Sequence, residues 1–319
     1  MMIFSGCSET GTDSASGELF AMDTYMSIKA SGQNSEEAVY QSESEIIRLD
    51  KLFSATDSGS DIYRINHSES AEVSSDTLKI ISESLEICES TGGSLDMTVY
   101  PIVKLWGFTT GEYRIPENNE IHNCLKSVNY NNINISGNSV SVPSGCELDL
   151  GAVAKGYTSD RIVEIFREKD IESGVINLGG NVYIYGSECE VSVRNPFFPD
   201  EIIGTLEISD KAVVTSGSYE RFFIGNDGKK YCHIIDPETG YPVDNGLVSV
   251  TVIGESGIYC DALSTALFVM GIDKAVEYWK NNGNFDMILI DNNHRIYVTE
   301  DIDFKSTGNS EIIKIEQKD

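Results

Sequence analysis

Residues 147–162 read ELDLGAVAKGYTSDRI, a run of small residues with one lysine at the start of a helical pattern. A Walker phosphate loop is excluded, because its lysine follows the second glycine and precedes Ser or Thr, whereas Lys155 precedes Gly156 here. The helix start still offers unpaired N–H groups and a positive dipole end to an anion. Asp149, just ahead of the helix, fits either an N-terminal cap, which is the commoner role, or a ligand contact.

Outward from this stretch, structure patterns continue to about residue 300 with no internal repeat and no linker that would divide the chain. Apolar residues three and four apart predict helices near 37–53 and 78–88, between Gly151 and Gly174, and in two segments that end at Gly271 and Gly283. Strand-like runs lie within 175–186, 211–224, 229–236 and 246–254, and a final hairpin within 285–299. Helices and strands neither alternate strictly nor separate, which favours an α+β fold with mixed or antiparallel sheets and packed helices, in one domain over residues 19–319.

The chain is strongly acidic: 51 Asp and Glu against 23 Lys and Arg give a formal net charge of −28. Such a field repels nucleic acid and anionic lipid surfaces, so neither is an expected partner. An anionic ligand would need a local group that offsets this negative charge. Two kinds of group can do so, a divalent cation and a cluster of backbone N–H groups at a helix start.

The first residues, MMIFSGC, end in two small residues and Cys7, and a polar stretch follows. They are too short for a whole signal peptide but resemble the end of one, at the processing site of a bacterial lipoprotein. We expect residues 1–18 to be a signal remnant and a flexible tether, and the protein to be exported and held by a lipid on Cys7 at the outer face of the cytoplasmic membrane. The alternative is an untidy N-terminus with a buried or free cysteine. Six other cysteines include no Cys-x-x-Cys pair, and their redox state stays open.

Two further patterns suit chemistry. Asp261 and Thr265 lie four residues apart, on one face of a nearly apolar helix, and their oxygens suit a hard divalent cation. A cap at the N-terminus of a core helix is the alternative for Asp261, because a buried carboxylate needs a partner of some kind. His233 ends a strand-like run beside a turn, where it fits a general base or, more commonly, a structural histidine. The glycine pair 179–180 and the run 215–221 fit either bulges or backbone that faces a ligand.

Taken in order, nine runs of the sequence resemble the ApbE family of flavin transferases. They are AMDTYMSIKA (21–30), FSATDSGSDIYRIN (53–66), GGSLDMTVYPIVKLWGF (92–108), ELDLGAVAKGYTSDRI (147–162), NLGGNVYIYG (177–186), VRNPF (193–197), VVTSGSYERFF (213–223), HIIDPETGYPV (233–243) and CDALSTALFVMG (260–271). The resemblance implies a single catalytic domain related to the T-fold. It also implies a magnesium-dependent FAD:protein FMN transferase, which cleaves FAD, attaches FMN to a Thr or Ser hydroxyl of an acceptor flavoprotein subunit and releases AMP.

The same resemblance implies roles for twelve residues. The Mg²⁺ ligands would be the Asp261 carboxylate, the Thr265 hydroxyl and the backbone oxygen of Ala152, and His233 would be the base for the acceptor hydroxyl. Contacts to FAD are implied for Met22, Thr56, Ser94, Leu95, Asp96, Asp149, Lys155 and Ile235. Two positions depart from the family pattern: Asp23 stands where glycine is common, and Thr56 stands where many relatives have a larger residue against the flavin.

These departures leave the balance between flavin transfer and FAD hydrolysis open. A magnesium-dependent FAD pyrophosphatase, with water as the acceptor, is therefore one alternative function. A non-catalytic FAD-binding lipoprotein is another. A solute-binding lipoprotein unrelated to flavin is a third, and it leaves the Asp261 and Thr265 pair unexplained.

Overall fold

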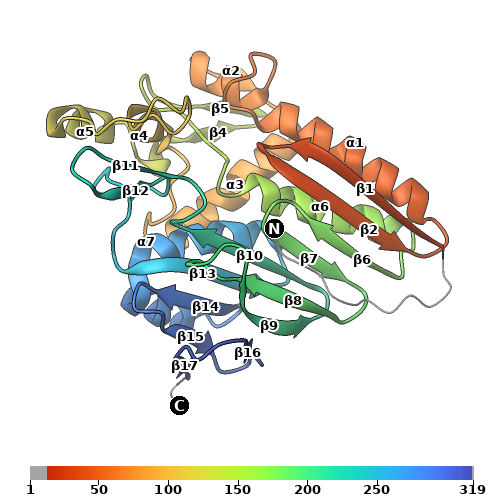
Figure 1. Cartoon of the computed structure of the whole chain (residues 1–319). Coiled ribbons are helices and arrows are strands. Elements are labelled where there is room, and N and C mark those ends of the chain that lie inside the picture. Colours follow the sequence, from red (N-terminus) through yellow and green to blue (C-terminus); the bar gives the residue numbers. More distant parts are fainter. Residues whose placement is uncertain (1–12, 318–319) are drawn as a thin grey trace.

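The computed structural model describes residues 13–317 and has a nine-stranded sheet at its centre (Figure 1). The strand order is β1-β2-β6-β7-β10-β13-β14-β15-β17, and every pairing is antiparallel except that of β15 with β17. The strands are β1 (Ser14–Ala21), β2 (Thr24–Ser31), β6 (Ser173–Asn177), β7 (Asn181–Tyr185), β10 (Lys211–Gly217), β13 (Leu247–Gly254), β14 (Asp286–Asp291), β15 (Ile296–Thr299) and β17 (Ile312–Ile315). The predicted α+β class, with a mixed sheet, is confirmed.

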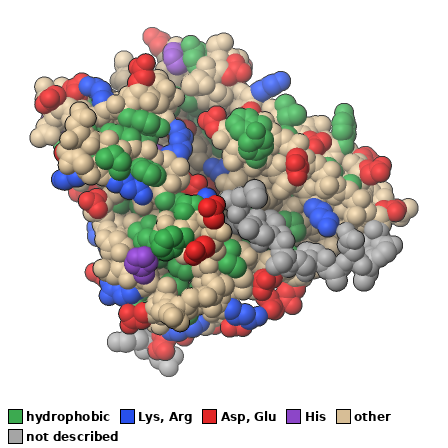
Figure 2. Space-filling model, in the orientation of Figure 1, with side chains coloured by type: hydrophobic (Ala, Val, Ile, Leu, Met, Phe, Trp, Pro, Cys, Tyr) green, Lys and Arg blue, Asp and Glu red, His purple; other side chains and the backbone are tan. Residues whose placement is uncertain are grey.

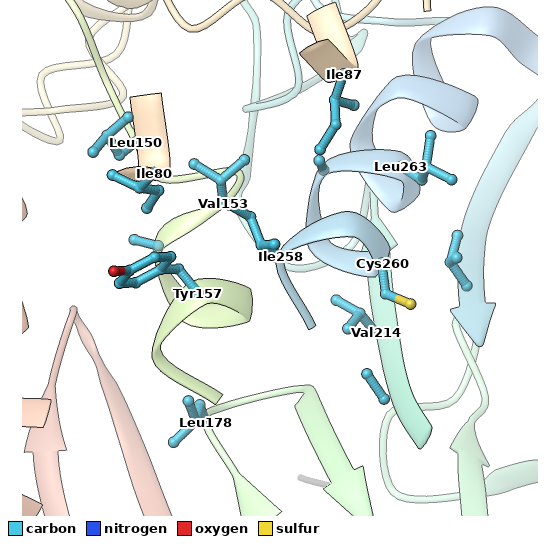
Figure 3. Close-up of a cluster of buried hydrophobic side chains, with 14 of the residues drawn as sticks. Ile80, Ile87, Leu150, Val153, Tyr157, Leu178, Val214, Ile258, Cys260 and Leu263 are labelled. Carbon is cyan, nitrogen blue, oxygen red and sulfur yellow. The ribbon is translucent and has the colours of Figure 1, made fainter. Parts of the chain in front are cut away.

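Three long helices cover one face of this sheet: α1 (Ser35–Phe53), α6 (Ala154–Glu168) and α7 (Gly257–Asn282) (Figure 1). All three agree with the predicted helical segments. Gly271, with φ 77° and ψ 173°, interrupts α7 where the sequence predicts the end of one helix and the start of the next. A continuous apolar core fills the space beneath α6 and α7, to which Tyr157, Ile258 and Leu263 contribute (Figure 3).

A second layer lies on the opposite face of the sheet, formed by β8 (Cys189–Arg194), β9 (Ile202–Ile208) and β16 (Lys305–Ser306). Side chains alternate along a strand, so β7 contributes to both cores. Tyr183 packs in the core on the helical side, whereas Val182 and Ile184 pack against β8 and β9 in a separate apolar cluster. The central sheet is thus buried on both faces at β7.

Smaller elements gather at one end of the sheet (Figure 1). They are α2 (Asp61–His67), β3 (Ala71–Glu72), α4 (Tyr100–Leu105), α5 (Asn118–Leu125), η1 (Tyr130–Asn132), β4 (Asn134–Ser136), β5 (Ser139–Ser141), β11 (Phe222–Ile224) and β12 (Lys230–Cys232). The longer helix α3 (Ser75–Ser90) precedes α4 and contacts α7. The segment predicted near 78–88 is α3. Trp106 anchors a third apolar cluster and donates a hydrogen bond from Nε1 to the Gly240 carbonyl, 2.9 Å away.

The predicted boundary between the tether and the folded domain is wrong by a few residues. Residues 14–18, expected in the tether, form the first half of β1, which pairs along its whole length with β2. These residues are mostly small and polar, and they stay largely unburied. Apolar and polar residues therefore do not alternate along this part of β1, and the sequence pattern does not indicate a strand there. Gly17 allows the close approach of α1, because a Cβ there would lie 2.8 Å from a Val39 methyl group. Cys7 lies outside the described residues.

Acidic side chains are scattered over the visible face, with Lys and Arg side chains between them, rather than gathered in one patch (Figure 2). In the described part of the chain, none of the helices is long and apolar enough to cross a membrane. Six cysteines lie between residues 13 and 317, and five of them are buried; no disulfide joins two of these six.

Candidate active site

A cavity of about 500 Å³ opens between the helical layer, the sheet and the smaller elements. Eleven of the twelve residues with predicted roles line it: Met22, Ser94, Leu95, Asp96, Asp149, Ala152, Lys155, His233, Ile235, Asp261 and Thr265. Thr56 is not among the lining residues. It is exposed in the loop between α1 and α2, where its N–H donates to the Ser54 hydroxyl 3.2 Å away.

The tight turn between β1 and β2 brings Met22 and Asp23 to the cavity. Both residues have left-handed backbone conformations, with φ of 47° and 58°, as the favoured two-residue hairpin turn requires. Glycine adopts this conformation most easily, but Asp adopts it more readily than most other residues, so Asp23 is compatible with the turn. The Met22 N–H donates to Asp50 Oδ1 of α1, 3.1 Å away, and this bond fixes the turn.

The carboxylate of Asp261 crosses from α7 to the start of α6, where its Oδ2 accepts the Gly156 N–H at 2.8 Å. The residue before α6, Val153, makes no side-chain capping bond. Of the two roles that the sequence leaves open for Asp149, the N-terminal cap is excluded: Asp149 accepts the Gly151 N–H at 3.0 Å in the turn ahead of the helix. Asp261 does not cap its own helix either, since Ser256 does so. Asp261 is both a cap for α6 and a cavity residue.

The two helices cap each other. Asp160 of α6 accepts the N–H groups of Gly257 and Ile258 at the start of α7, at 2.6 and 3.0 Å. The backbones touch at this crossing, because a Cβ on Gly156 would lie 2.3 Å from the Gly257 carbonyl oxygen. This close contact fixes Asp261 relative to the loop that precedes α6.

Five acidic residues line the cavity, and burial raises the pKa of three of them, Asp96, Asp149 and Asp261, above its ordinary value. Lys155 acts in the opposite direction on the pKa of Asp149 and Asp261, because its charge favours their ionised forms. Lys155 itself lines the cavity, and no ion pair within the described part of the chain includes it. Its ammonium group is available to an anionic ligand.

Asp96 has a structural role beside its place in the cavity wall. Its Oδ1 accepts the N–H and the hydroxyl of Thr98 at 2.8 and 2.6 Å, and its Oδ2 accepts the Tyr130 N–H at 3.0 Å. These bonds hold the loop that follows α3 against the cavity. Ser94 and Leu95 lie in the same loop and line the cavity with Asp96.

His233 follows β12 and lines the cavity. Nδ1 lies 3.2 Å from the Arg221 carbonyl oxygen, and since a carbonyl only accepts, Nδ1 carries the proton. The lone pair is therefore on Nε2. Burial lowers the pKa of His233 to about 4, and the Arg221 charge adds to this effect, so the imidazole is neutral near pH 7. A neutral imidazole with a free Nε2 is a competent proton acceptor.

The donor set in the cavity fits a hard divalent cation. Asp261 supplies a carboxylate, Thr265 a hydroxyl one helical turn further on, and Ala152 a backbone carbonyl. Thr265 Oγ1 lies 3.3 Å from the Ser216 hydroxyl, so it is held by a weak bond only. Among residues 13–317 there is no group of three or more His, Cys, Asp and Glu side chains that are placed to hold a metal ion.

Several lining residues have no predicted role, among them Arg194, Asn181 and Arg221. Arg221 ends the run 215–221, which the sequence marks as a weak ligand candidate, and Asn181 directly follows the glycine pair 179–180. Asp160, which positions α7, has no local sequence signal, because its partners lie 97 and 98 residues away.

Comparison with known proteins agrees with this geometry. The sequence profile of the ApbE family matches residues 22–289, and the chain belongs to this family. A relative from Klebsiella pneumoniae (strain 342), named FAD:protein FMN transferase, is 33% identical over 261 residues, which cover 80% of this chain and 82% of the relative. A Vibrio cholerae relative of the same name is 33% identical over 231 residues, covering 68% of each chain.

Solved structures extend the likeness to the fold. The crystal structure of the ApbE protein from Thermotoga maritima superposes with a TM-score of 0.85 at 34% identity, covering 90% of this chain and 97% of that chain. The flavin transferase ApbE from Vibrio cholerae superposes with a TM-score of 0.78 at 28% identity, covering 94% and 98%.

Proposed function

We propose that this chain is a FAD:protein FMN transferase that moves FMN from FAD to a Thr or Ser hydroxyl of an acceptor flavoprotein. The observation that carries the proposal is the neutral His233, with a free Nε2, in one cavity with Asp261, Thr265 and Lys155. The names of the relatives support it. A binding protein has no need for a base beside the phosphate-binding groups.

The reaction breaks one P–O bond and forms another. His233 Nε2 takes the proton of the acceptor hydroxyl, and the oxygen attacks the phosphorus of the FMN half of FAD. The bond from this phosphorus to the AMP oxygen breaks, and AMP leaves. Lys155 and the N–H groups at the start of α6 bind the pyrophosphate oxygens, since a cation and a helix start both favour negative charge. The loop of Asp96 and the turn of Met22 shape the walls of the cavity against FAD.

We further propose that the reaction requires Mg²⁺, held by Asp261, Thr265 and the carbonyl oxygen of Ala152. When bound, the cation would neutralise charge on the pyrophosphate as the bond to AMP breaks. The carboxyl groups of Asp96, Asp149 and Asp261 in the cavity support this proposal, because in their ionised forms they would repel a pyrophosphate that is bound without a cation.

Flavin transfer can be tested with FAD, MgCl₂ and purified flavoprotein subunits as candidate acceptors. We expect a fluorescent flavin band that survives denaturing electrophoresis, and its loss in His233→Ala or when EDTA replaces MgCl₂. If AMP is released at the same rate with and without acceptor, and no band forms, the pyrophosphatase is the correct function. If FAD binds but neither product appears, the chain is a flavin-binding protein.

We also propose that the protein is exported and anchored by a lipid on Cys7. The sequence MMIFSGC supports this, and Cys7 precedes the described residues. Cells that express the chain behind a complete lipoprotein signal and are grown with a radiolabelled fatty acid should yield a labelled, membrane-bound protein. A Cys7→Ser variant should be unlabelled. Equal labelling of both proteins would refute the anchor.

A further inference from the structure

The side chain of Asn181 is buried with neither of its polar atoms satisfied. It opens β7, is fully buried, and neither Oδ1 nor Nδ2 has a hydrogen-bond partner among the described residues. Only Ser249 Oγ shares this condition in the described part of the chain. An amide in this state is costly, and native proteins rarely keep one without a reason.

Asn181 faces the metal-binding side of the cavity. It lies two residues before Tyr183, so its side chain points to the same face of the sheet, towards α6 and α7. It also lines the cavity, as Asp261 does. The amide is close enough to Asp261 to favour the ionised form of that carboxylate and thus to lower its pKa, against the larger effect of burial.

The glycine pair before Asn181 leaves room for a ligand at this point. A Cβ on Gly179 would lie 2.2 Å from the Thr24 hydroxyl, so the loop is pressed against β2. A Cβ on Gly180 would meet nothing within 4 Å, and Gly180 lines the cavity. Their φ values of 72° and 100° are left-handed, a conformation that favours glycine. Backbone and amide here border open space.

We propose that Asn181 is a positioning residue of the cation site, which orients the Asp261 carboxylate when the cation is bound. Its Nδ2 would donate to that carboxylate, because carboxylates that bind metals are themselves hydrogen-bonded. This inference rests on the proposed magnesium requirement.

The test measures cation binding directly, with Mn²⁺ as a spectroscopic substitute for Mg²⁺. Titrations with the FAD-free protein, followed by the electron paramagnetic resonance of unbound Mn²⁺, give the dissociation constant. In Asn181→Leu, which keeps a similar side-chain volume, we expect it to rise about 10- to 100-fold, the usual effect of losing a group that supports a metal ligand. Ser249→Ala removes the other unpaired buried group and should bind Mn²⁺ as the wild type does.

A purely structural role predicts a different pattern. If Asn181 acts through the cation, Asn181→Leu unfolds at the same or a higher temperature than the wild type without metal, because an unsatisfied amide has been removed. If it only supports the fold, this temperature falls and Mn²⁺ affinity is unchanged. Asn181→Ala removes the same amide without adding an apolar branch, and it must show the same weakened binding if Asn181→Leu does not fold.

The outcomes separate the two proposals. Equal Mn²⁺ affinity in the wild type and either Asn181 variant overturns the role of Asn181, while the magnesium requirement stands. A wild type that binds no Mn²⁺ overturns the cation site and this inference with it. Weakened binding in the variants with FAD affinity unchanged in EDTA, measured by flavin fluorescence, supports the inference.

Discussion

Replacing Gly156 by alanine should destabilise the protein, although the same change in an ordinary helix stabilises it. Gly156 is the third residue of α6, where helix propensity alone favours alanine by about 0.5–1 kcal/mol. At this crossing, however, the new Cβ would lie 2.3 Å from the Gly257 carbonyl oxygen and 2.7 Å from the Asp261 Cβ. Neither atom can rotate away, so α6 and α7 must move apart.

The expected cost has two parts. Overpacking of a tight contact costs about 1–3 kcal/mol. Separation also weakens the 2.8 Å bond from the Gly156 N–H to Asp261, and a hydrogen bond to a charged group contributes about 1.5–3 kcal/mol. After the gain in helix propensity is subtracted, we expect a net loss of about 2–5 kcal/mol and a fall in Tm of roughly 3–7 °C.

Thermal unfolding followed by circular dichroism near neutral pH measures this effect. Gly151→Ala is the matched control, because its Cβ would meet nothing closer than the Asp149 carboxylate at 3.4 Å, an ordinary contact. Its Tm should stay near that of the wild type. A Gly156→Ala protein that unfolds at or above the wild-type Tm would refute the close-packing argument, since propensity would then be the dominant effect.

Three other variants test the electrostatics of the cavity. In the wild type, kcat/KM for flavin transfer should fall on the acidic side of its pH profile near pH 4 rather than near pH 6.5, because the pKa of His233 is lowered. A fall near pH 6.5 would contradict the role of His233 as the base, and so would an acidic fall that persists in His233→Gln. Because the pKa of Asp261 is raised, its contribution to stability is lost as pH rises through the folded-state value, so Asp261→Asn should raise the metal-free Tm near neutral pH and abolish any stabilisation by Mg²⁺. A lower metal-free Tm would contradict this sign. Lys155→Met should weaken FAD binding about 10-fold or more with little change in Tm, as measured by flavin fluorescence, whereas unchanged affinity would place the pyrophosphate elsewhere.

Local patterns predicted most of the helices and strands. Apolar spacing located α1, α3, α6 and both halves of α7, and it failed at β1, whose small polar residues are held by the ladder with β2 instead of by burial. Eleven of the twelve residues to which the family motifs gave roles line the cavity, since each motif keeps its residue types together in the sequence. Thr56 is the exception, and its predicted flavin contact stays a prediction.

Long-range contacts could not be predicted in the same way. The bond between Gly156 and Asp261 joins residues 105 positions apart, and no local pattern shows that the cap of one helix lies on another. The sequence indicated a cap near α6 and a cap near α7. In the structure, Asp261 of α7 binds the start of α6, and Asp160 of α6 binds the start of α7. The unsatisfied amide of Asn181 is likewise a property of its folded surroundings, which neither composition nor spacing reveals.

The cavity draws on both ends of the sequence: Met22 lies in the first hairpin and Thr265 in the last long helix. During synthesis, therefore, a nascent chain shorter than about 265 residues lacks part of the flavin site, and an early fragment has no complete cavity. FAD capture would then follow completion of the domain rather than nucleate it. Quenching of flavin fluorescence during refolding should consequently report the last step of assembly, when α7 docks against α6.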